Sequence, residues 1–293
     1  MSVTEPAPIR LHEDPVLFRE AVNYTAAETG FMARLVEKDY FCSVVLQHLA
    51  GASDELTFRG GTCLAKVHAE FYRLSEDLDF VIPTDVDASR GERSRRAAQS
   101  KRAVGNVGMH VPGLSVITQP TGANDSMQYN AVLGYESVLG PHEETIKIEV
   151  ALREHLLEPP INGEVQTLLL NPISDSPMIP PFSLACLSQQ EAMAEKLRAA
   201  LSRRGVAIRD FYDVDYAVRQ LNVSVLEPEL VALVRRKLAV PGNDPPDVSE
   251  VRLAALRPQL ESQLKAVLRP SDFAKFDLER AFATVAGVAA AMG

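Results

Sequence analysis

The feature that most restricts the fold is a pair of aspartates on an apolar segment, close behind a pair of glycines. The aspartates are Asp77 and Asp79 in Asp-Leu-Asp-Phe-Val-Ile, and the glycines are Gly60 and Gly61. Alternate side chains of a strand point to the same face. A strand at residues 77–82 therefore projects both carboxylates together and turns the intervening apolar residues into the core.

The glycines come directly before a predicted helix at residues 63–71, with Thr62 as the expected N-cap. Backbone N–H groups at a helix start attract phosphate, and a glycine lets the backbone approach it closely. A glycine pair is also common in ordinary turns, and this one matches neither a P-loop nor a dinucleotide fingerprint. Gly60 and Gly61 therefore favour a phosphate site only in combination with the aspartates that follow.

Aspartates on so apolar a strand are costly to bury unless a cation or a metal ion pairs with them. A site for two Mg²⁺ ions needs a further carboxylate, and we expect Glu149 to supply it from a strand at residues 145–152. The alternation around Glu149 is also typical of any half-exposed antiparallel strand. Asp77, Asp79 and Glu149 are thus the predicted metal ligands, beside a nucleoside triphosphate as substrate.

A second group of charged residues occurs on helical segments further along the chain. Lys196 has alanine and methionine neighbours at helical spacing, an unusual setting for a solvated lysine. Asp210 and Asp213 lie one helical turn apart, which is also what an ordinary helix start or an intrahelical ion pair would give. We expect Lys196 to neutralise phosphate charge and Asp210 to orient Lys196 or the acceptor.

The predicted fold is α/β of the α+β type, with a mixed sheet followed by an all-helical C-terminal domain. Proline-rich residues 171–181 suggest a linker. Periodicity predicts helices at residues 16–49, broken near Gly30, and a polar helix at 84–104. The expected domains are an N-terminal helical arm at 1–50, a catalytic domain at 51–172 and a helical domain at 182–293. The remaining expected strands lie at 56–58, 114–118, 128–135 and 165–170.

Composition excludes some partners and leaves others open. The formal net charge of −9 argues against indiscriminate coating of nucleic acid. A local basic stretch remains compatible either with a solvated helix face or with binding to the phosphates of RNA. The candidate RNA-binding residues are Arg90, Arg93, Arg95, Arg96, Lys101 and Arg102.

The sequence also indicates the cellular setting. No apolar run is long enough for a transmembrane helix, and the first residues do not resemble a secretion signal. Cys42, Cys63 and Cys186 are scattered, and their spacing fits neither a disulfide framework nor a zinc motif. We therefore expect a cytoplasmic protein with reduced thiols, no membrane partner and an oligomeric state that the sequence leaves open.

Three ordered segments together resemble the AbiEii/AbiGii toxin family, nucleotidyltransferases with a DNA polymerase beta-like fold from toxin–antitoxin and abortive-infection systems. The segments are Gly-Gly-Thr-x-Leu-x-Lys, Arg-x-Ser-x-Asp-x-Asp-Phe and the later Glu-Lys-Leu-x-Ala with Arg-Asp-x-x-Asp. Glu37-Lys38-Asp39-Tyr40 also resembles the family's N-terminal helix. The resemblance implies catalytic roles for Asp77, Asp79, Glu149, Lys196 and Asp210. It implies nucleotide contacts for Gly60, Gly61, Thr62, Lys66, Ser75 and Lys196.

The resemblance implies transfer of a nucleoside monophosphate from an NTP to an acceptor hydroxyl, with Mg²⁺ as cofactor and pyrophosphate as leaving group. It suggests a tRNA 3′ end as acceptor, which the basic stretch mildly favours, and a cognate antitoxin as partner. A phosphate added to Ser75 would repel the triphosphate, so this residue is a candidate point of control. The alternatives are a protein-modifying (NMPylating) enzyme, a small-molecule nucleotidyltransferase and a non-catalytic nucleotide-binding module.

Overall fold

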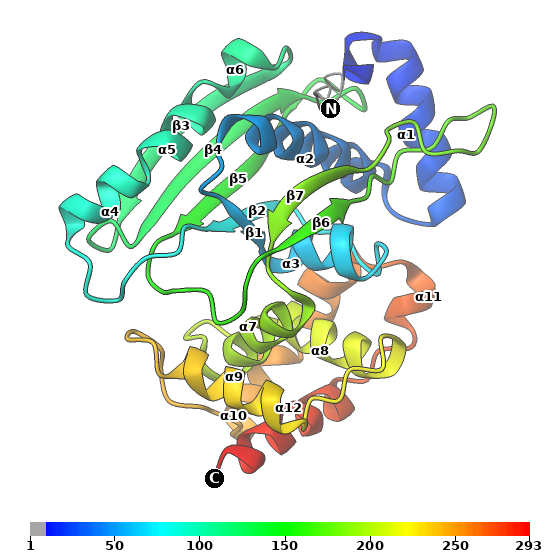
Figure 1. The fold of residues 1–293 in the computed structure, drawn as a ribbon. Helices are drawn as coiled ribbons and strands as arrows, with labels where there is room; N and C mark the ends of the chain where they lie inside the picture. Colours follow the sequence, from blue (N-terminus) through cyan, green and yellow to red (C-terminus); the bar gives the residue numbers. More distant parts are fainter. Residues whose placement is uncertain (1–9) are drawn as a thin grey trace. The chain divides into compact units, whose positions relative to one another are not determined.

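The computed structural model describes residues 10–293, which form two compact units (Figure 1). Of the described residues, the first unit contains 10–155 and 160–186, and the second contains Leu156–Pro159 and Leu187–Gly293. The second unit thus begins five residues later than the expected domain start at residue 182. The difference arises because residues 182–186 form a strand of the first unit rather than the start of the helical domain.

The first unit is built on a seven-stranded mixed sheet with the order β3-β4-β5-β2-β1-β7-β6. The β2–β5 and β1–β7 pairs are parallel, and the other neighbouring pairs are antiparallel. Three strands at the centre, β2, β5 and β1, carry the predicted turn and carboxylates. The strands are β1 (Thr57–Arg59), β2 (Asp77–Val81), β3 (Leu114–Ala123), β4 (Gln128–Glu136), β5 (Glu143–Ala151), β6 (Ile161–Val165) and β7 (Phe182–Cys186).

The expected strand at residues 165–170 and the expected linker after it are corrected by the structure. The strand β6 ends at Val165, and Leu170 forms only an isolated bridge with Pro177. Residues 171–181 are a loop inside the sheet unit, and β7 follows it with its alternate residues Phe182, Leu184 and Cys186 buried. The prolines of this segment mark a turn before an inner strand, which composition alone does not distinguish from a linker.

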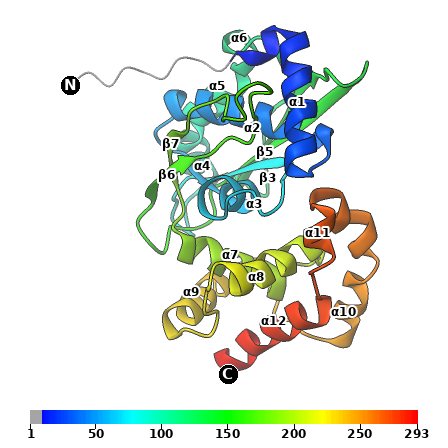
Figure 2. The ribbon, with the colours of Figure 1, turned by 90° about the vertical axis from the view of Figure 1, so that its right-hand side faces the viewer.

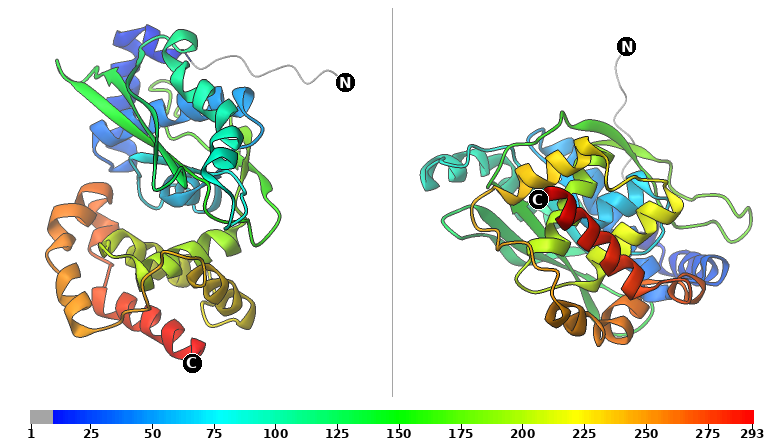
Figure 3. Two further views of the ribbon diagram at one scale, coloured as in Figure 1. Left: turned by 90° about the vertical axis from the view of Figure 1, so that its left-hand side faces the viewer. Right: turned by 90° about the horizontal axis from the view of Figure 1, so that it is seen from below.

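One face of the sheet is covered by the N-terminal helices and by the helices that follow β2. The long helix α2 packs on β5, β7 and α5, while α5 and α6 lie along β3 (Figure 3). The expected break near residue 30 is confirmed, because Gly30 ends the first helix with a left-handed φ of 76°. The helices are η1 (Leu11–Glu13), α1 (Pro15–Thr29), α2 (Ala33–Ala52), α4 (Arg90–Arg96), α5 (Ala98–Gly105) and α6 (Val107–His110).

The all-helical C-terminal part expected from the sequence is found in the second unit, whose first helix begins at Gln189. Its helices α7 and α8 pack on each other, and α12 packs on both of them (Figure 2). Ser188 begins α7 by accepting a hydrogen bond from the backbone N–H of Glu191. The elements are α7 (Gln189–Ser202), α8 (Ile208–Gln220), α9 (Pro228–Leu238), α10 (Glu250–Leu256), η3 (Leu260–Leu264), η4 (Lys265–Val267), α11 (Pro270–Phe273) and α12 (Leu278–Met292). Within residues 10–293, no helix is both long enough and apolar enough to cross a membrane.

Candidate active site

The glycine turn joins β1 to a short helix, α3 (Gly60–Cys63), which continues as the π-helical turn η2 (Leu64–His68). Gly60 has a φ of +81°, a conformation that residues with a side chain rarely adopt. A Cβ atom at this position would lie only 2.2 Å from Oδ2 of Asp79. The glycine is therefore required both by the backbone conformation and by the close approach of a predicted metal ligand.

The helix start differs from the sequence prediction. It lies at Gly60 rather than at Cys63, so Thr62 is inside the helix and caps nothing. The side chain of Thr62 is buried, and its hydroxyl donates a 2.5 Å hydrogen bond to the backbone carbonyl of Asp77. The Thr62 hydroxyl, which was expected to contact the triphosphate, instead donates this hydrogen bond, and the bond fixes the start of β2 against α3.

Gly61 is held against the residues that precede β2. A Cβ atom on Gly61 would come within 2.4 Å of the Arg73 guanidinium and within 3.1 Å of the Ser75 hydroxyl. Arg73 itself is buried and donates to the carbonyl of Leu74. Ser75 thus lies against the glycine turn, and its contact with a nucleotide stays a prediction.

The carboxylates occupy one face of the sheet, as the alternation predicts. Leu78 and Phe80 are fully buried, whereas Asp77 and Asp79 are half-buried. Asp79 pairs with Glu149 in the parallel register of β2 and β5. Directly paired residues point to the same face, so the structure brings Asp79 and Glu149 together, with Asp77 two residues away.

Arg59, which the sequence analysis did not single out, belongs to the same row of side chains. It pairs with Asp79 in the antiparallel register of β1 and β2, and its guanidinium lies 3.7 Å from Glu149 Oε1. On the other side, Glu149 pairs with Asn130 of β4. Arg59, Asp79, Glu149 and Asn130 therefore form one polar row across four strands, which we call the cross-strand row. Strand order is a non-local property, so no local pattern identifies Arg59.

The second group of predicted residues lies in the helical unit. Lys196 of α7 forms ion pairs with Asp210 Oδ1 at 3.1 Å and with Asp213 Oδ2 at 2.8 Å, both from α8. Arg203 also lies 3.4 Å from Asp210. The two aspartates are buried, so the lysine sits between two carboxylates at the α7–α8 packing surface. The pair joins Lys196 to Asp210, and a role of either residue in the reaction stays a prediction.

Comparison with known proteins gives the same family as the sequence motifs. A sequence model of the nucleotidyl transferase AbiEii toxin family, described as type IV toxin–antitoxin proteins, matches residues 44–287. The chain belongs to the AbiEii nucleotidyltransferase toxin family. A search of curated proteins gives no match.

Two solved structures show that the fold of this AbiEii-family chain is shared. MenT4, a nucleotidyltransferase toxin from Mycobacterium tuberculosis, matches with a TM-score of 0.61 and 20% identity over 94% of this chain and 98% of its own. JHP933 from Helicobacter pylori matches with a TM-score of 0.52 and 16% identity over 89% of this chain and 93% of its own. The mixed sheet followed by helices is thus a fold that this chain shares with MenT4 and JHP933.

Lys66, the lysine of the Gly-Gly-Thr-x-Leu-x-Lys segment, does not have the expected role in this AbiEii-family protein. Its side chain is fully buried, and Nζ donates to Asp39 Oδ2 and Ser43 Oγ, both at 2.8 Å. A lysine at 0% exposure has no access to a nucleotide, so the assignment of Lys66 to nucleotide binding is wrong. Lys66 instead anchors η2 to α2 through a buried ion pair.

The Glu37-Lys38-Asp39-Tyr40 segment is likewise structural. Glu37 is buried and accepts hydrogen bonds from the Ser137 hydroxyl and the Val138 backbone N–H, both at 2.7 Å. Lys38 pairs with Glu76, the residue immediately before Asp77, at 3.4 Å. These contacts tie α2 to the segment that leads into β2 and to the residues between β4 and β5.

The six basic residues between Arg90 and Arg102 differ in how far they are buried. Arg93 is buried and donates to the backbone carbonyls of Leu152 and Val86, so it does not belong to an RNA-binding surface. The expected single helix is two helices, α4 and α5, which begin at the Ser89 cap. Lys101 is half-buried and lies 4.7 Å from the centre of the Tyr129 ring. The exposed members are Arg90, Arg95, Arg96 and Arg102.

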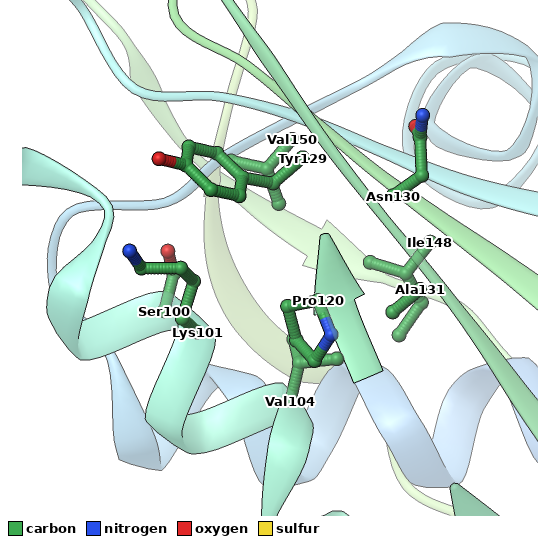
Figure 4. Close-up of a pocket in the computed structure, with 9 residues that line it drawn as sticks. All are labelled: Ser100, Lys101, Val104, Pro120, Tyr129, Asn130, Ala131, Ile148 and Val150. Carbon is green, nitrogen blue, oxygen red and sulfur yellow. The ribbon is translucent and has the colours of Figure 1, made fainter. Parts of the chain in front are cut away.

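A small pocket is lined by residues of α5 and of the sheet (Figure 4). Its lining includes Ile148 and Val150, which alternate with Glu149 and therefore point away from it. Lys101 and Tyr129 also line it, together with Pro120. The pocket is accordingly a gap in the packing of α5, and Asn130 is the member of the cross-strand row that contributes to its lining.

Two carboxylates of the cross-strand row, together with Asp77, fit a hard divalent cation. Asp77, Asp79 and Glu149 offer carboxylate oxygens, the ligands that Mg²⁺ prefers. They lie on neighbouring strands, and none of them is fully buried. The glycine turn packs on Asp79 and leaves no side chain between its backbone and the carboxylate. These residues can therefore hold Mg²⁺ and admit a phosphate beside it.

Proposed function

We propose that this AbiEii-family toxin transfers a nucleoside monophosphate from an NTP to the 3′ end of tRNA, with Mg²⁺ as cofactor. The acceptor oxygen forms a bond to the α-phosphorus, the bond from that phosphorus to the bridging oxygen breaks, and pyrophosphate leaves. The observation that carries the proposal is the alignment of Asp79 with Glu149 on paired strands, with Asp77 on the same face and Gly60 packed on Asp79.

Each residue of the site has a part that follows from its contacts. Asp77, Asp79 and Glu149 would hold Mg²⁺, which when bound lowers the pKa of an attacking hydroxyl and neutralises phosphate oxygens. Gly60 and Gly61 allow the backbone to approach the phosphates closely. Thr62 keeps β2 in place by its bond to the Asp77 carbonyl. Arg59 partly offsets the carboxylate charge of the row.

We also assign a part in the reaction to Lys196 and Asp210, on the basis of the family pattern and of their ion pair in the helical unit. A Lys196→Met variant should lose transfer activity. Its melting temperature should also fall, because the buried Asp210 and Asp213 lose their partner, so activity is measured at a temperature at which the variant is still folded by circular dichroism. The matched control is Lys265→Met, because Lys265 forms an exposed pair with Glu261 one turn away. Equal activity of the two variants would remove Lys196 from the proposal.

The first experiment incubates the full chain with total bacterial RNA, Mg²⁺ and each α-labelled NTP in turn. A labelled band of tRNA size with wild type, absent with Asp77→Ala and absent when EDTA replaces Mg²⁺, is the expected result. Label on protein with none on RNA would replace the acceptor by a protein hydroxyl. No label on either, from a protein with a native circular dichroism spectrum, would refute the RNA proposal and favour a small-molecule acceptor or a non-catalytic module.

The choice of RNA as acceptor rests on the exposed arginines of α4 and α5. Charge reversal at Arg95 and Arg102 should reduce labelling of RNA because it replaces attraction to phosphates by repulsion. The matched control reverses Arg204 and Arg236, which are exposed arginines of the helical unit, and changes the net charge equally. Equal loss in both double variants would indicate a general charge effect rather than a binding surface.

The family description implies a toxin–antitoxin system, and we propose a cognate antitoxin and a cytoplasmic location. Because Ser75 lies against the glycine turn, modification of its hydroxyl is the mode of control that we would test first. A Ser75→Ala variant should retain activity and escape the antitoxin. If the antitoxin suppresses this variant as strongly as wild type, control acts elsewhere.

A further inference from the structure

Three metal-ligating side chains meet in the sheet unit at a place that the catalytic proposal does not use. The Sγ atoms of Cys63 and Cys186 and a ring nitrogen of His68 all lie within 4.8 Å of one another. Cys63 ends α3, His68 ends η2, and Cys186 ends β7. We call these residues the Cys–His–Cys cluster. Their positions in the sequence do not form a zinc motif, and only the fold brings them together.

The π-helical turn η2 places two of the three ligands on one side. In a regular α-helix, residues five apart are separated by about 140° around the axis. Cys63 and His68 are five apart, and the turn between them is π-helical, so that residues i and i+5 come nearly into line. Single π-turns occur frequently at functional sites. The local departure from α-helical geometry is thus what gives the cluster two ligands from one segment.

The third ligand comes from the strand beside β1. Cys186 pairs with Phe58 in the parallel register of β1 and β7, so it lies next to the strand that leads into the glycine turn. A Cβ atom on Gly163 of β6 would come within 2.5 Å of the Cys186 sulfur and 2.6 Å of Val67. The absence of a side chain at Gly163 therefore provides the space that the sulfur occupies.

The environment of Cys186 differs from that of the chain's remaining cysteine. Cys186 lies within 4.8 Å of the ligand atoms of Cys63 and His68, whereas Cys42 is outside this group. Both cysteines are fully buried, so the contrast arises from the neighbours and not from exposure.

We propose that Cys63, His68 and Cys186 form a binding site for a thiophilic divalent ion, with Zn²⁺ as the expected occupant. Thiolate and imidazole are ligands that zinc prefers, and three protein ligands leave one position of a tetrahedron for water or another ligand. Zinc–sulfur bonds of about 2.3 Å require sulfurs about 3.8 Å apart. The observed limit of 4.8 Å is close enough for small side-chain rotations to complete the site.

The site is chemically distinct from the carboxylate site. Its soft sulfur ligands select a different class of metal from the oxygen ligands of Asp77, Asp79 and Glu149. An ion bound here joins α3 and η2, which carry the glycine turn, to β7. Binding of Zn²⁺ should therefore stabilise the folded chain and hold the glycine turn in place, since a ligand that binds only the folded state raises its stability.

The test uses the full-length chain under reducing conditions, loaded with Zn²⁺ or with Co²⁺ as a spectroscopic substitute. We expect about one ion per chain by mass spectrometry, a thiolate-to-cobalt charge-transfer band in the near ultraviolet, and a higher melting temperature with Zn²⁺. Cys186→Ser and His68→Ala should each weaken or abolish the band. Cys42→Ser is the matched control, because Cys42 is equally buried but lies outside the cluster.

Two further outcomes decide the proposal. Asp77→Ala should retain the cobalt band, which separates this site from the carboxylate site and from the outcome of the transfer assay. A folded wild-type chain without a band, or a band of equal strength in wild type, Cys186→Ser and His68→Ala, would overturn the proposal. Formation of a Cys63–Cys186 disulfide on oxidation, with no metal bound to the reduced chain, would also overturn it.

Discussion

Replacement of Gly60 by alanine tests the central link between the glycine turn and the carboxylates. The backbone φ of +81° is unfavourable for alanine and should cost about 1–2 kcal/mol of folding free energy. The added Cβ atom would also lie 2.2 Å from Asp79 Oδ2, whereas ordinary contact begins at 3.4 Å. The carboxylate must therefore move by about 1.2 Å, the difference between these two distances.

The displacement is the larger effect for catalysis. A shift of about 1 Å in a reacting or metal-binding group costs on the order of 100-fold in rate. We therefore expect Gly60→Ala to lower kcat/KM for the NTP about 100-fold, with a modest loss of stability in urea unfolding. The matched control is Gly51→Ala, because Gly51 lies in α2 with nothing within 4 Å of its added Cβ. That change should leave activity unaltered and stabilise the chain by about 0.5–1 kcal/mol.

A double-mutant cycle separates the steric contact from the backbone effect. In an Asp79→Gly background the clash partner is gone, so Gly60→Ala should cost only the backbone penalty in stability and little further activity. The two changes are expected to be strongly non-additive in activity, because both act through the Asp79 carboxylate. Wild-type activity in Gly60→Ala, or fully additive losses in the cycle, would refute the reasoning.

Four other changes follow from single contacts. Lys66→Met leaves Asp39 buried without its partner and should lower the free energy of unfolding by about 3–5 kcal/mol. The double variant Lys66→Met/Asp39→Leu should recover most of this loss. A Lys66→Met protein that is stable but inactive would restore a direct role for the lysine. Arg59→Met removes a positive charge 3.7 Å from Glu149 and should tighten Mn²⁺ binding several-fold in calorimetry, a direction that weaker binding would contradict. Burial raises the pKa of Glu76, but the positive charges of Lys38 and Arg34 have the larger effect, so the pKa lies below the ordinary value of 4.5. The ion pairs of Glu76 therefore stabilise the fold fully above about pH 4.5. This stabilisation is lost as the pH falls through the lowered pKa of Glu76. Glu76→Gln should therefore flatten the acid limb of the unfolding free energy, which an unchanged limb would disprove. Ser75→Asp should raise KM for the NTP by placing charge against the glycine turn, whereas Ser75→Ala should not; equal KM values would count against a nucleotide site there.

The parts of the site that depend on local periodicity could be predicted from the sequence. Alternation placed Asp77 and Asp79 on one face, and the structure confirms that face. The apolar strand around Glu149 was likewise predicted from its period of two. The sequence motifs identified the family, because their order along the chain is more specific than any single segment.

What depends on strand order or on burial could not be predicted in the same way. Arg59 enters the site only because β1 pairs with β2 in a register that aligns it with Asp79. Lys66 follows the glycine motif in the sequence, yet it is fully buried and bonds to Asp39 and Ser43 of α2. Cys63 and Cys186 are far apart in the sequence, and their meeting requires both the π-turn and the parallel β1–β7 pair. Each of these results is set by non-local pairing.

Direct contacts between the glycine motif and the aspartate motif explain why the two occur together, even if some of their residues do not touch substrate. Gly60 must be a glycine because Asp79 occupies the space of its side chain, and Gly61 because Arg73 and Ser75 occupy the space of its own. Thr62 adds a hydrogen bond from its hydroxyl to the Asp77 carbonyl, which links α3 to β2. The glycine turn is therefore shaped by the carboxylate strand before any nucleotide arrives. A substitution in the glycine motif therefore also displaces residues of the aspartate motif, and the reverse. Loss of activity after a glycine is replaced need not mean that a contact with phosphate is lost.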